Sequence, residues 1–270
     1  MNNTNKTALI TGASRGIGYE LAKLFVKDSY NLVLIARSKD KLKEIKEEFS
    51  KKYNVDILII VKDLSVPNAA IEIFNEIEKQ EIIIDVLVNN AGIGDFGLFN
   101  NENLLKISQM MQINIITLTE LTKLFLKGMV ERKKGKILNV SSLAAFQSGP
   151  YMAVYYASKA YVQSFSEAIA SELKGTGVTV TTLCPGPTKS GFQHEVGSKN
   201  SNLAKLNLLS SSEEVAKDAY KALFAGKKVV IPGFFNTSLV NTAKIIPRKT
   251  KTHIIKKLQE FNRKEIFSNN

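Results

Sequence analysis

The stretch TALITGASRGIG, residues 7–18, decides the fold of this chain. It begins with a short apolar run at 7–11, passes through a glycine-rich turn and leads into an amphipathic segment. Such a turn between a strand and a helix lets the backbone approach a pyrophosphate and aims helix N-terminal amides at its charge. The spacing Gly-x-x-x-Gly-x-Gly is one residue longer in its first gap than the common dinucleotide fingerprint. The stretch predicts a nucleotide site formed by Gly12, Ser14, Arg15, Gly16, Ile17 and Gly18.

Outward from this stretch, short apolar runs alternate with longer amphipathic segments, as in a parallel sheet covered by helices. We expect strands at 7–11, 31–36, 56–61, 85–89, 136–141, 178–183 and 229–232. We expect helices at about 16–27, 39–53, 68–79, 101–130, 152–174 and 212–224, the last one opened by a capping box of Ser211 and Glu214. The predicted fold class is α/β, a doubly wound Rossmann-type three-layer sandwich with a seven-stranded parallel sheet. No linker, repeat or low-complexity tract divides the chain, so we expect a single domain over 1–270.

Composition restricts the classes of protein that the chain can belong to. Hydrophobic residues make up 44% of it, which is enough for a sizeable core, and no run approaches the roughly 20 apolar residues of a membrane span. The first expected strand lies too close to Met1 for a signal peptide, so we expect a soluble cytoplasmic protein. Cys184 is the only cysteine, which excludes an intrachain disulfide. With His194 and His253 as the only histidines, no metal site is expected.

The formal net charge of +12 is concentrated toward the C-terminus. A basic extension at about 241–270 holds eight of the basic residues (Lys244, Arg248, Lys249, Lys251, Lys256, Lys257, Arg263, Lys264) against Glu260 and Glu265. Apolar residues recur between these lysines, and Pro247 interrupts them, which is typical of a basic amphipathic helix. Such a helix could lie on an anionic membrane, but we favour packing against the domain or a second subunit. The extension has no interleaved aromatic residues, so we expect no nucleic-acid partner.

The end of the second expected strand indicates which dinucleotide binds. A site for NAD would be expected to place Asp or Glu there, whereas this chain has Ala36-Arg37-Ser38-Lys39. A carboxylate would repel a 2′-phosphate, but a guanidinium can bind it in a bidentate way. Arg37, with Arg15 as a second clamp, therefore favours NADP(H). The alternative is that Arg37 is a solvated residue at a strand end.

Two further motifs follow strands at the edge where parallel sheets bind their ligands. Asp63 and Leu64 follow the third expected strand, and Asn89-Asn90-Ala91-Gly92 ends the fourth. Asp63 could accept a hydrogen bond from an adenine amino group. The small residues Ala91 and Gly92 would let the backbone pass close to a cofactor ribose, while the asparagines tie loops together. Ordinary turn chemistry is the alternative interpretation of the asparagine pair.

Tyr155 lies four residues before Lys159 in an expected helix, so the two side chains would share one face. A tyrosine ionises near pH ~10, and a neighbouring ammonium would favour its phenolate. Alone, this spacing occurs by chance in many helices.

Together these motifs resemble the short-chain dehydrogenase/reductase family, and the resemblance extends from Thr7 to about Pro232. The family's catalytic asparagine matches Asn114, its catalytic serine matches Ser142, thirteen residues before Tyr155, and its Tyr-x-x-x-Lys pair matches Tyr155 and Lys159. Its Pro-Gly motif matches Pro185 and Gly186, with Thr188 placed to meet the nicotinamide carboxamide. Ser141 and Tyr156 do not fit these spacings.

The resemblance implies an NADP(H)-dependent carbonyl reductase. It implies that Tyr155 exchanges a proton with the substrate oxygen, and that Lys159 holds the nicotinamide ribose and lowers the pKa of the tyrosine. It also implies that Ser142 polarises the substrate oxygen and that Asn114 holds a water linking Lys159 to solvent. A homodimer or homotetramer, built through the helices at 101–130 and 152–174, is implied as well.

Substrate contacts are expected from a flap at about 188–211, which holds Phe192, Leu203, Leu206, Leu208 and Leu209. Phe96, Phe99, Phe146 and Tyr151 could line the same pocket or belong to core and lid packing. An apolar pocket favours a hydrophobic ketone, an aldehyde or a 3-oxoacyl chain. The alternatives are an alcohol or steroid dehydrogenase working in the oxidative direction, and a catalytically silent NADPH-sensing regulator.

Overall fold

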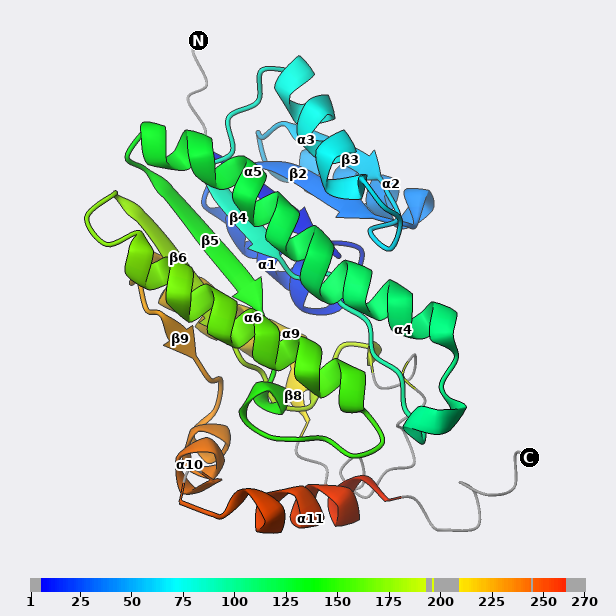
Figure 1. The fold of residues 1–270 in the computed structure, drawn as a ribbon. Helices are drawn as coiled ribbons and strands as arrows, with labels where there is room; N and C mark the ends of the chain where they lie inside the picture. Colours follow the sequence, from blue (N-terminus) through cyan, green and yellow to red (C-terminus); the bar gives the residue numbers. More distant parts are fainter. Residues whose placement is uncertain (1–5, 193–195, 197–208, 244, 261–270) are drawn as a thin grey trace.

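A single parallel sheet forms the middle layer of the molecule (Figure 1). The computed structural model describes residues 6–192, 196, 209–243 and 245–260. The sheet has seven strands in the order β3-β2-β1-β4-β5-β6-β9, all parallel. They are β1 (Thr7–Thr11), β2 (Asn31–Ala36), β3 (Ile57–Val61), β4 (Val86–Asn89), β5 (Gly135–Val140), β6 (Val178–Leu183) and β9 (Val229–Val230). The predicted doubly wound α/β class is confirmed.

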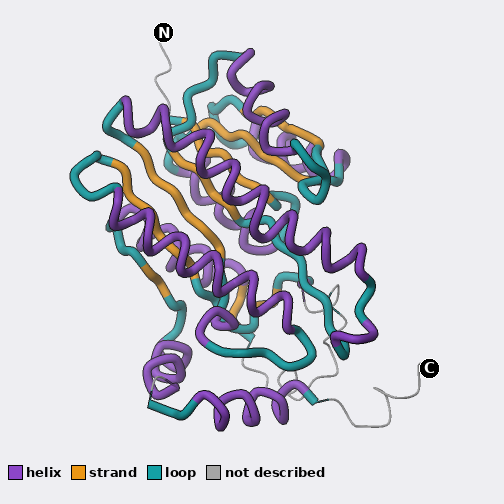
Figure 2. Tube along the Cα trace, in the orientation of Figure 1, coloured by secondary structure: helices purple, strands orange, loops and turns teal. Residues whose placement is uncertain are grey.

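Helices cover both faces of this sheet (Figure 2). One face carries α1 (Gly16–Lys27), α2 (Lys39–Ser50) and α9 (Ser212–Phe224), and the other carries α3 (Ala69–Lys79), α5 (Leu118–Glu131) and α6 (Ala153–Glu172). Because successive side chains of a strand point to opposite faces, Ile10 packs in the core beneath α1 while its neighbour Leu9 packs in the core beneath α5. A sheet buried on both faces explains why its strands are nearly continuous apolar runs.

The strand order reverses between β1 and β4. The chain builds β1, β2 and β3 toward one edge and then returns to place β4 on the other side of β1. Side chains join the two strand ends: Thr11 Oγ1 accepts the backbone N–H groups of Asn90 and Ala91, each at 3.0 Å. Asn90 Nδ2 donates to Thr11 O at 2.9 Å and to Gly12 O at 3.1 Å. Ligands of open α/β sheets bind at such a reversal, so the glycine turn lies where a ligand is expected.

The helix predicted over 101–130 begins at Leu104 instead and runs without a gap to Glu131, but it widens in the middle. A 3-10 turn (Phe99–Asn101) precedes α4 (Leu104–Met111), a π-helical turn at Gln112–Thr117 follows, and α5 completes the segment. The π turn contains Asn114, whose side chain binds the backbone of Ile93 outside the helix. π turns widen a helix locally and recur at functional sites.

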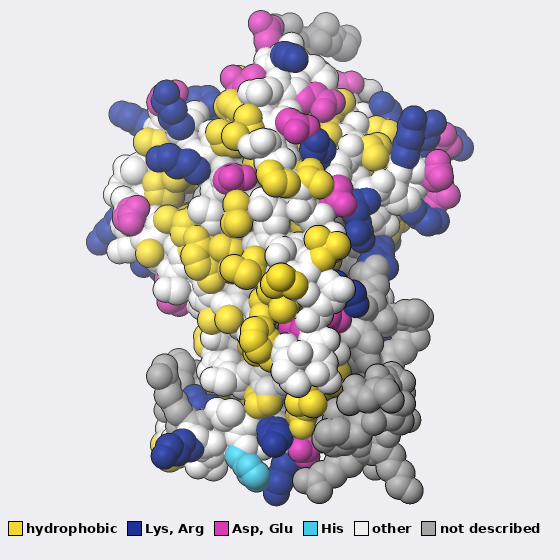
Figure 3. Space-filling model, turned by 45° about the vertical axis from the view of Figure 1, so that its right-hand side comes forward, with side chains coloured by type: hydrophobic (Ala, Val, Ile, Leu, Met, Phe, Trp, Pro, Cys, Tyr) yellow, Lys and Arg dark blue, Asp and Glu magenta, His cyan; other side chains and the backbone are white. Residues whose placement is uncertain are grey.

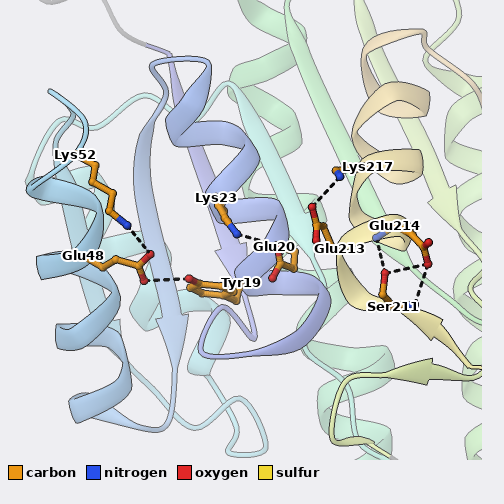
Figure 4. A network of polar contacts seen from close by, with 9 residues as sticks. All are labelled: Tyr19, Glu20, Lys23, Glu48, Lys52, Ser211, Glu213, Glu214 and Lys217. Atoms are coloured by element: carbon orange, nitrogen blue, oxygen red, sulfur yellow. Dashed lines mark hydrogen bonds and ion pairs between the residues drawn. The ribbon is translucent and has the colours of Figure 1, made fainter.

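Helix ends on the α1 and α9 side are fixed by short polar contacts (Figure 4). The predicted capping box is confirmed: the Ser211 hydroxyl accepts the Glu214 backbone N–H at 3.1 Å, and the Glu214 carboxylate accepts the Ser211 N–H at 3.1 Å. Tyr19 on α1 donates to Glu48 on α2 at 3.0 Å, which links two neighbouring helices. The exposed Lys217–Glu213 pair at 2.7 Å adds little, because water screens it.

Two helices follow the last strand: the first was not predicted, and the second lies within the basic extension for which an amphipathic helix was expected. They are α10 (Phe234–Ala243) and α11 (Arg248–Gln259), and Pro247 precedes α11. Figure 1 shows α11 running beneath the end of the sheet to which the β5 arrow points. A small second sheet pairs β7 (Thr188–Lys189) with β8 (Ser210–Ser211). Within the described residues, no helix is long and apolar enough to cross a membrane.

Candidate active site

A cavity of about 380 Å³ lies at the carboxyl edge of the sheet. The glycine turn, the ends of several strands, α6, α10 and α11 all contribute to its wall. It is lined by most of the predicted residues, namely Gly12, Ser14, Arg15, Gly16, Ile17, Arg37, Asp63, Leu64, Asn90, Ala91, Gly92, Ser142, Tyr155, Lys159, Pro185, Gly186 and Thr188. Gly18 and Asn114 lie behind this wall. The fold therefore brings together motifs spread over more than half of the sequence.

The glycine turn has the shape of a dinucleotide cradle. Gly12 and Gly16 have φ angles of 65° and 58°, in the left-handed region that favours glycine. A Cβ on Gly18 would lie 2.4 Å from the backbone oxygen of Gly12, so a side chain there would force the turn apart. The N-terminus of α1 begins directly behind the turn and presents its free amides toward the cavity. These features fit a pyrophosphate.

Charged side chains mark one end of the cavity. Arg37 is exposed at the end of β2, and Asp63 follows β3, the neighbouring strand. Burial opposes ionisation of Asp63, but hydrogen bonds from the backbone and hydroxyl of Ser65, together with the Arg37 charge, hold the pKa of Asp63 below its usual value. Lys62, which the sequence analysis did not select, also lines this end and pairs with Glu72. At the end of β2, where a site for NAD would be expected to place an acid, this cavity has the arginine Arg37.

The predicted catalytic side chains come from α6 and from Ser142, which precedes the 3-10 turn (Leu143–Phe146) after β5. Tyr155 and Lys159 lie one helical turn apart, with Lys159 Nζ 5.8 Å from the centre of the tyrosine ring. Lys159 Nζ donates to Val140 O at 2.9 Å, and the hydroxyl of Ser142 is a hydrogen-bond partner of Tyr155. The neighbouring Ser141 is buried and donates to the backbone oxygen of Lys159 at 2.8 Å. Ser142, rather than Ser141, therefore faces the tyrosine hydroxyl.

Burial controls the ionisation of the pair. It raises the pKa of Tyr155 to about 12, although the hydrogen bond with Ser142 opposes the shift, and it lowers the pKa of Lys159 to about 8. The expectation that Lys159 lowers the pKa of the tyrosine is corrected for the chain by itself. The reason is that the Lys159 side chain is 4% exposed and binds a carbonyl, so desolvation of the phenol dominates. A phenol with a raised pKa keeps its proton at neutral pH, as a proton donor must.

Asn114 holds the cavity wall in place. Its Oδ1 accepts the Ile93 N–H at 3.0 Å, and its Nδ2 donates to Ile93 O at 2.9 Å and to the Ser158 hydroxyl at 3.0 Å. A Cβ on Gly92 would come within 3.2 Å of Lys159 Nζ and 3.3 Å of Asn114 Oδ1, so the glycine keeps the space between these two atoms open. The water expected between Lys159 and solvent stays a prediction.

Some of the remaining predicted positions line the cavity or pack beside it, and others do not. Thr188 is buried on the cavity wall and donates to Gly186 O at 2.9 Å. Phe192, from the expected flap, packs 5.3 Å from the Tyr155 ring, whereas Leu203, Leu206 and Leu208 lie outside the described residues. Phe96 and Tyr151 stack on each other beside the cavity, but Phe99 is 62% exposed and Phe146 does not line it.

Sequence reasoning missed the contribution of the C-terminal helices. Phe235 and Leu239 of α10 and Ile255, Leu258 and Gln259 of α11 line the cavity. Residues 255, 258 and 259 follow the three- and four-residue spacing of one helix face, which was the available signal. This face packs on the domain. Packing on the domain was one of the two favoured alternatives for the basic extension.

The site is that of an oxidoreductase with a dinucleotide cradle and a tyrosine–lysine pair, and comparison with known proteins agrees. The family model described as short chain dehydrogenase matches residues 6–201. The chain is 34% identical to the ketoacyl reductase HetN of Nostoc sp. over 227 residues, which cover 82% of this chain and 76% of that protein. It is 36% identical to the very-long-chain 3-oxoacyl-CoA reductase of Rattus norvegicus over 182 residues, or 66% of this chain.

That alignment covers 58% of the rat protein, so the chain spans less than two thirds of this relative's length. A solved structure of a 7β-hydroxysteroid dehydrogenase superimposes with a TM-score of 0.82 at 25% identity, over 93% of this chain and 96% of that one. The chain belongs to the short-chain dehydrogenase/reductase family. It is an oxidoreductase that acts on hydroxyl or carbonyl groups of small molecules with a nicotinamide dinucleotide.

Proposed function

We propose that this enzyme reduces a hydrophobic ketone, aldehyde or 3-oxoacyl substrate with NADPH. The observation that carries the proposal is an apolar wall directly beside the proton donor. Tyr155 packs in one cluster with Ala144, Met152, Tyr156, Val196, Phe96, Phe192 and Ile255. A polar sugar would gain little from such a wall, whereas an alkyl chain would bury its surface there. The names of the reductases from Nostoc sp. and Rattus norvegicus support an oxoacyl substrate.

The mechanism follows from the positions of three side chains. NADPH, when bound, supplies the hydride that reduces the carbonyl carbon. Tyr155 gives its proton to the carbonyl oxygen, because its raised pKa keeps the hydroxyl protonated until an alkoxide forms beside it. Ser142 donates a hydrogen bond to the same oxygen and orients it. Lys159 would hold the nicotinamide ribose, and its ammonium stabilises the phenolate left after proton transfer.

The test of this function is a panel of carbonyl compounds of increasing chain length. Oxidation of NADPH, followed by its absorbance, is expected with long-chain ketones, aldehydes and 3-oxoacyl thioesters, and the rate should rise with chain length up to the capacity of the cavity. Oxidation of secondary alcohols or steroids by NADP measures the alternative, which the resemblance to a 7β-hydroxysteroid dehydrogenase keeps open. Absence of turnover with every carbonyl compound and every alcohol would contradict an enzymatic role.

Arg37→Asp is expected to reverse the cofactor preference. The new carboxylate would repel the 2′-phosphate of NADPH and would accept hydrogen bonds from the free ribose hydroxyls of NADH. We expect the KM for NADPH to rise about 10- to 100-fold and the KM for NADH to fall, since charge-assisted bonds to a phosphate each contribute on the order of 1.5–3 kcal/mol. Initial rates with both cofactors at saturating carbonyl substrate give the two constants.

The matched control is Lys43→Asp, because Lys43 is also exposed and lies on α2, just beyond Arg37. It makes the same change in charge away from the cavity, so the preference for NADPH should remain. A wild-type enzyme that prefers NADH would refute the assignment of Arg37.

We also propose a homodimer or homotetramer formed through α4, α5 and α6. Figure 3 shows apolar side chains gathered across the middle of one face of the molecule. On these helices and the π turn between them, Leu104, Leu105, Met111, Ile116 and Tyr161 are exposed, with Leu104 at 76% and Leu105 at 66%. An apolar patch of this kind is typical of an interface. Sedimentation velocity should give a dimer or tetramer, and a monomer at micromolar concentration would contradict the proposal.

A further inference from the structure

Helix α11 closes the substrate end of the cavity and is tied to the residues around the catalytic tyrosine. Gln259, at the end of α11, is 3% exposed, and its Nε2 donates to the hydroxyl of Tyr156. The same Nε2 lies 3.9 Å from Met152 Sδ, and Tyr151 donates to Glu260 at 3.3 Å. A residue more than a hundred positions away in the sequence therefore forms part of the wall beside Tyr155.

The Gln259 side chain is incompletely paired in this position. Its Oε1 is buried and has no hydrogen-bond partner among the described residues. If the amide turned over, Oε1 would accept from the Tyr156 hydroxyl and Nε2 would become the unpaired end. Either way, one polar end of the buried amide has no partner among the described residues, and buried polar groups normally have one.

Its surroundings make this unpaired end stand out. Met152, Ile255 and Leu258 line the cavity with it, and all three are apolar. The amide binds the hydroxyl of Tyr156, whose ring lies 6.1 Å from the ring of Tyr155. Simple apolar packing at this place would be served better by leucine, because a buried amide without a partner is costly.

We propose that Gln259 recognises a second oxygen function of the substrate, close to the carbonyl that is reduced. In a 3-oxoacyl thioester this function is the thioester carbonyl, two carbons from the reacting one, and Gln259 Nε2 donates to it while Oε1 accepts from Tyr156. The side chain thus selects a 1,3-dicarbonyl compound over a plain ketone of the same length. This inference rests on the proposed function and names its substrate class.

The test compares two substrates of equal chain length in Gln259→Leu, which keeps the volume of the side chain and removes its hydrogen bonds. For a 3-oxoacyl thioester, kcat/KM is expected to fall about 10- to 100-fold, because the loss of a partner for a buried polar group discriminates strongly. For the plain ketone, kcat/KM should stay within about threefold of the wild-type value. A fall of the same size for both substrates, or no fall for either, overturns the inference.

A control variant separates recognition from anchoring of α11. Tyr151→Phe removes the bond between Tyr151 and Glu260 at the end of the helix, and Tyr151 does not itself line the cavity. Any effect of it should be the same for both substrates. A discrimination as large as that of Gln259→Leu would mean that loosening of α11, and not loss of the amide, causes the change.

A binding measurement tests the role of Gln259 separately from the proposed function. If the wild-type enzyme reduces neither substrate, the proposed function fails, and the role of Gln259 is then measured without turnover. A 3-hydroxyacyl thioester should raise the melting temperature of the wild-type protein more than that of Gln259→Leu, whereas a simple secondary alcohol of equal length should raise both equally. Equal shifts with the thioester would refute the role of Gln259.

Discussion

Tyr155→Phe is expected to lower kcat for carbonyl reduction by about 10²- to 10⁴-fold, the usual contribution of a general acid. The substitution removes the hydroxyl that donates the proton and leaves the ring, so packing against Phe192 at 5.3 Å is kept. Affinity for NADPH should change less than about threefold, because the cradle of Gly12–Gly18 and Lys159 is intact. Single-turnover rates give the loss of chemistry, and fluorescence titration with NADPH gives the affinity.

The matched control is Tyr161→Phe, because Tyr161 lies on the same helix with its hydroxyl bonded to Thr119 at 3.0 Å, away from the cavity. Its kcat should equal that of the wild type. Turnover by Tyr155→Phe near the wild-type rate would show that another group protonates the substrate, and the assigned mechanism would be wrong.

Lys159→Met is expected to stabilise the protein without its cofactor while lowering kcat/KM by at least about 10²-fold. A buried ammonium is costly: desolvation lowers the pKa of Lys159 from 10.5 to about 8, which corresponds to a penalty on the order of 3 kcal/mol at neutral pH. Loss of the hydrogen bond from Lys159 to Val140 O costs about 1 kcal/mol, which offsets part of the stability gained by removing the buried charge. A net increase in the free energy of unfolding of about 2 kcal/mol is expected, measured by urea denaturation at pH 7.

The pH dependence gives a second measurement. Because the pKa of Lys159 is lower in the folded chain, the unfolded chain binds more protons between about pH 8 and 10.5, and stability should rise with pH in that window. Below about pH 8 the penalty is fully present and constant. Lys159→Met should lack this rise.

Lys136→Met is the control for activity, since Lys136 is a partly buried lysine of β5 that bonds Leu223 O, away from the cavity. Its kcat/KM should equal the wild-type value. The expectation is contradicted if Lys159→Met is less stable than the wild type at pH 7 and its stability still rises above pH 8. The Lys159 ammonium would then contribute to folding and not only to function.

Structural features that are encoded within a few residues were predicted well, whereas features that depend on distant contacts were not. Strands were predicted to within one or two residues, because a sheet covered on both faces makes each strand a short apolar run with clear ends. The glycine turn and the Tyr155–Lys159 pair are spacings within a few residues, so the sequence alone indicates them. The helix predicted over 101–130 holds from Leu104 onward, but its π turn was not predicted, because the contact between Asn114 and Ile93 that accompanies it is not encoded in the local sequence.

The same reasoning explains why α10 and Gln259 were missed. The segment Phe234–Ala243 has no clear apolar face, since Phe234 and Phe235 are both exposed to solvent. Gln259 is an ordinary polar residue among lysines, and only the path of the chain brings it to Tyr156, 103 positions earlier. The spacing of residues 255, 258 and 259 marks one face of a helix, but it does not show which part of the chain that face meets.

The position of α11 has a consequence for the order in which the enzyme is made. A ribosome releases the chain from its N-terminus, so the glycine turn, β4 and the Tyr155–Lys159 pair leave the exit tunnel long before α11 does. The nucleotide half of the cavity consists of early segments, and the wall that meets the substrate is completed by a late one. Substitutions in α11 can therefore change one wall of the cavity without altering the earlier segments that line its other end.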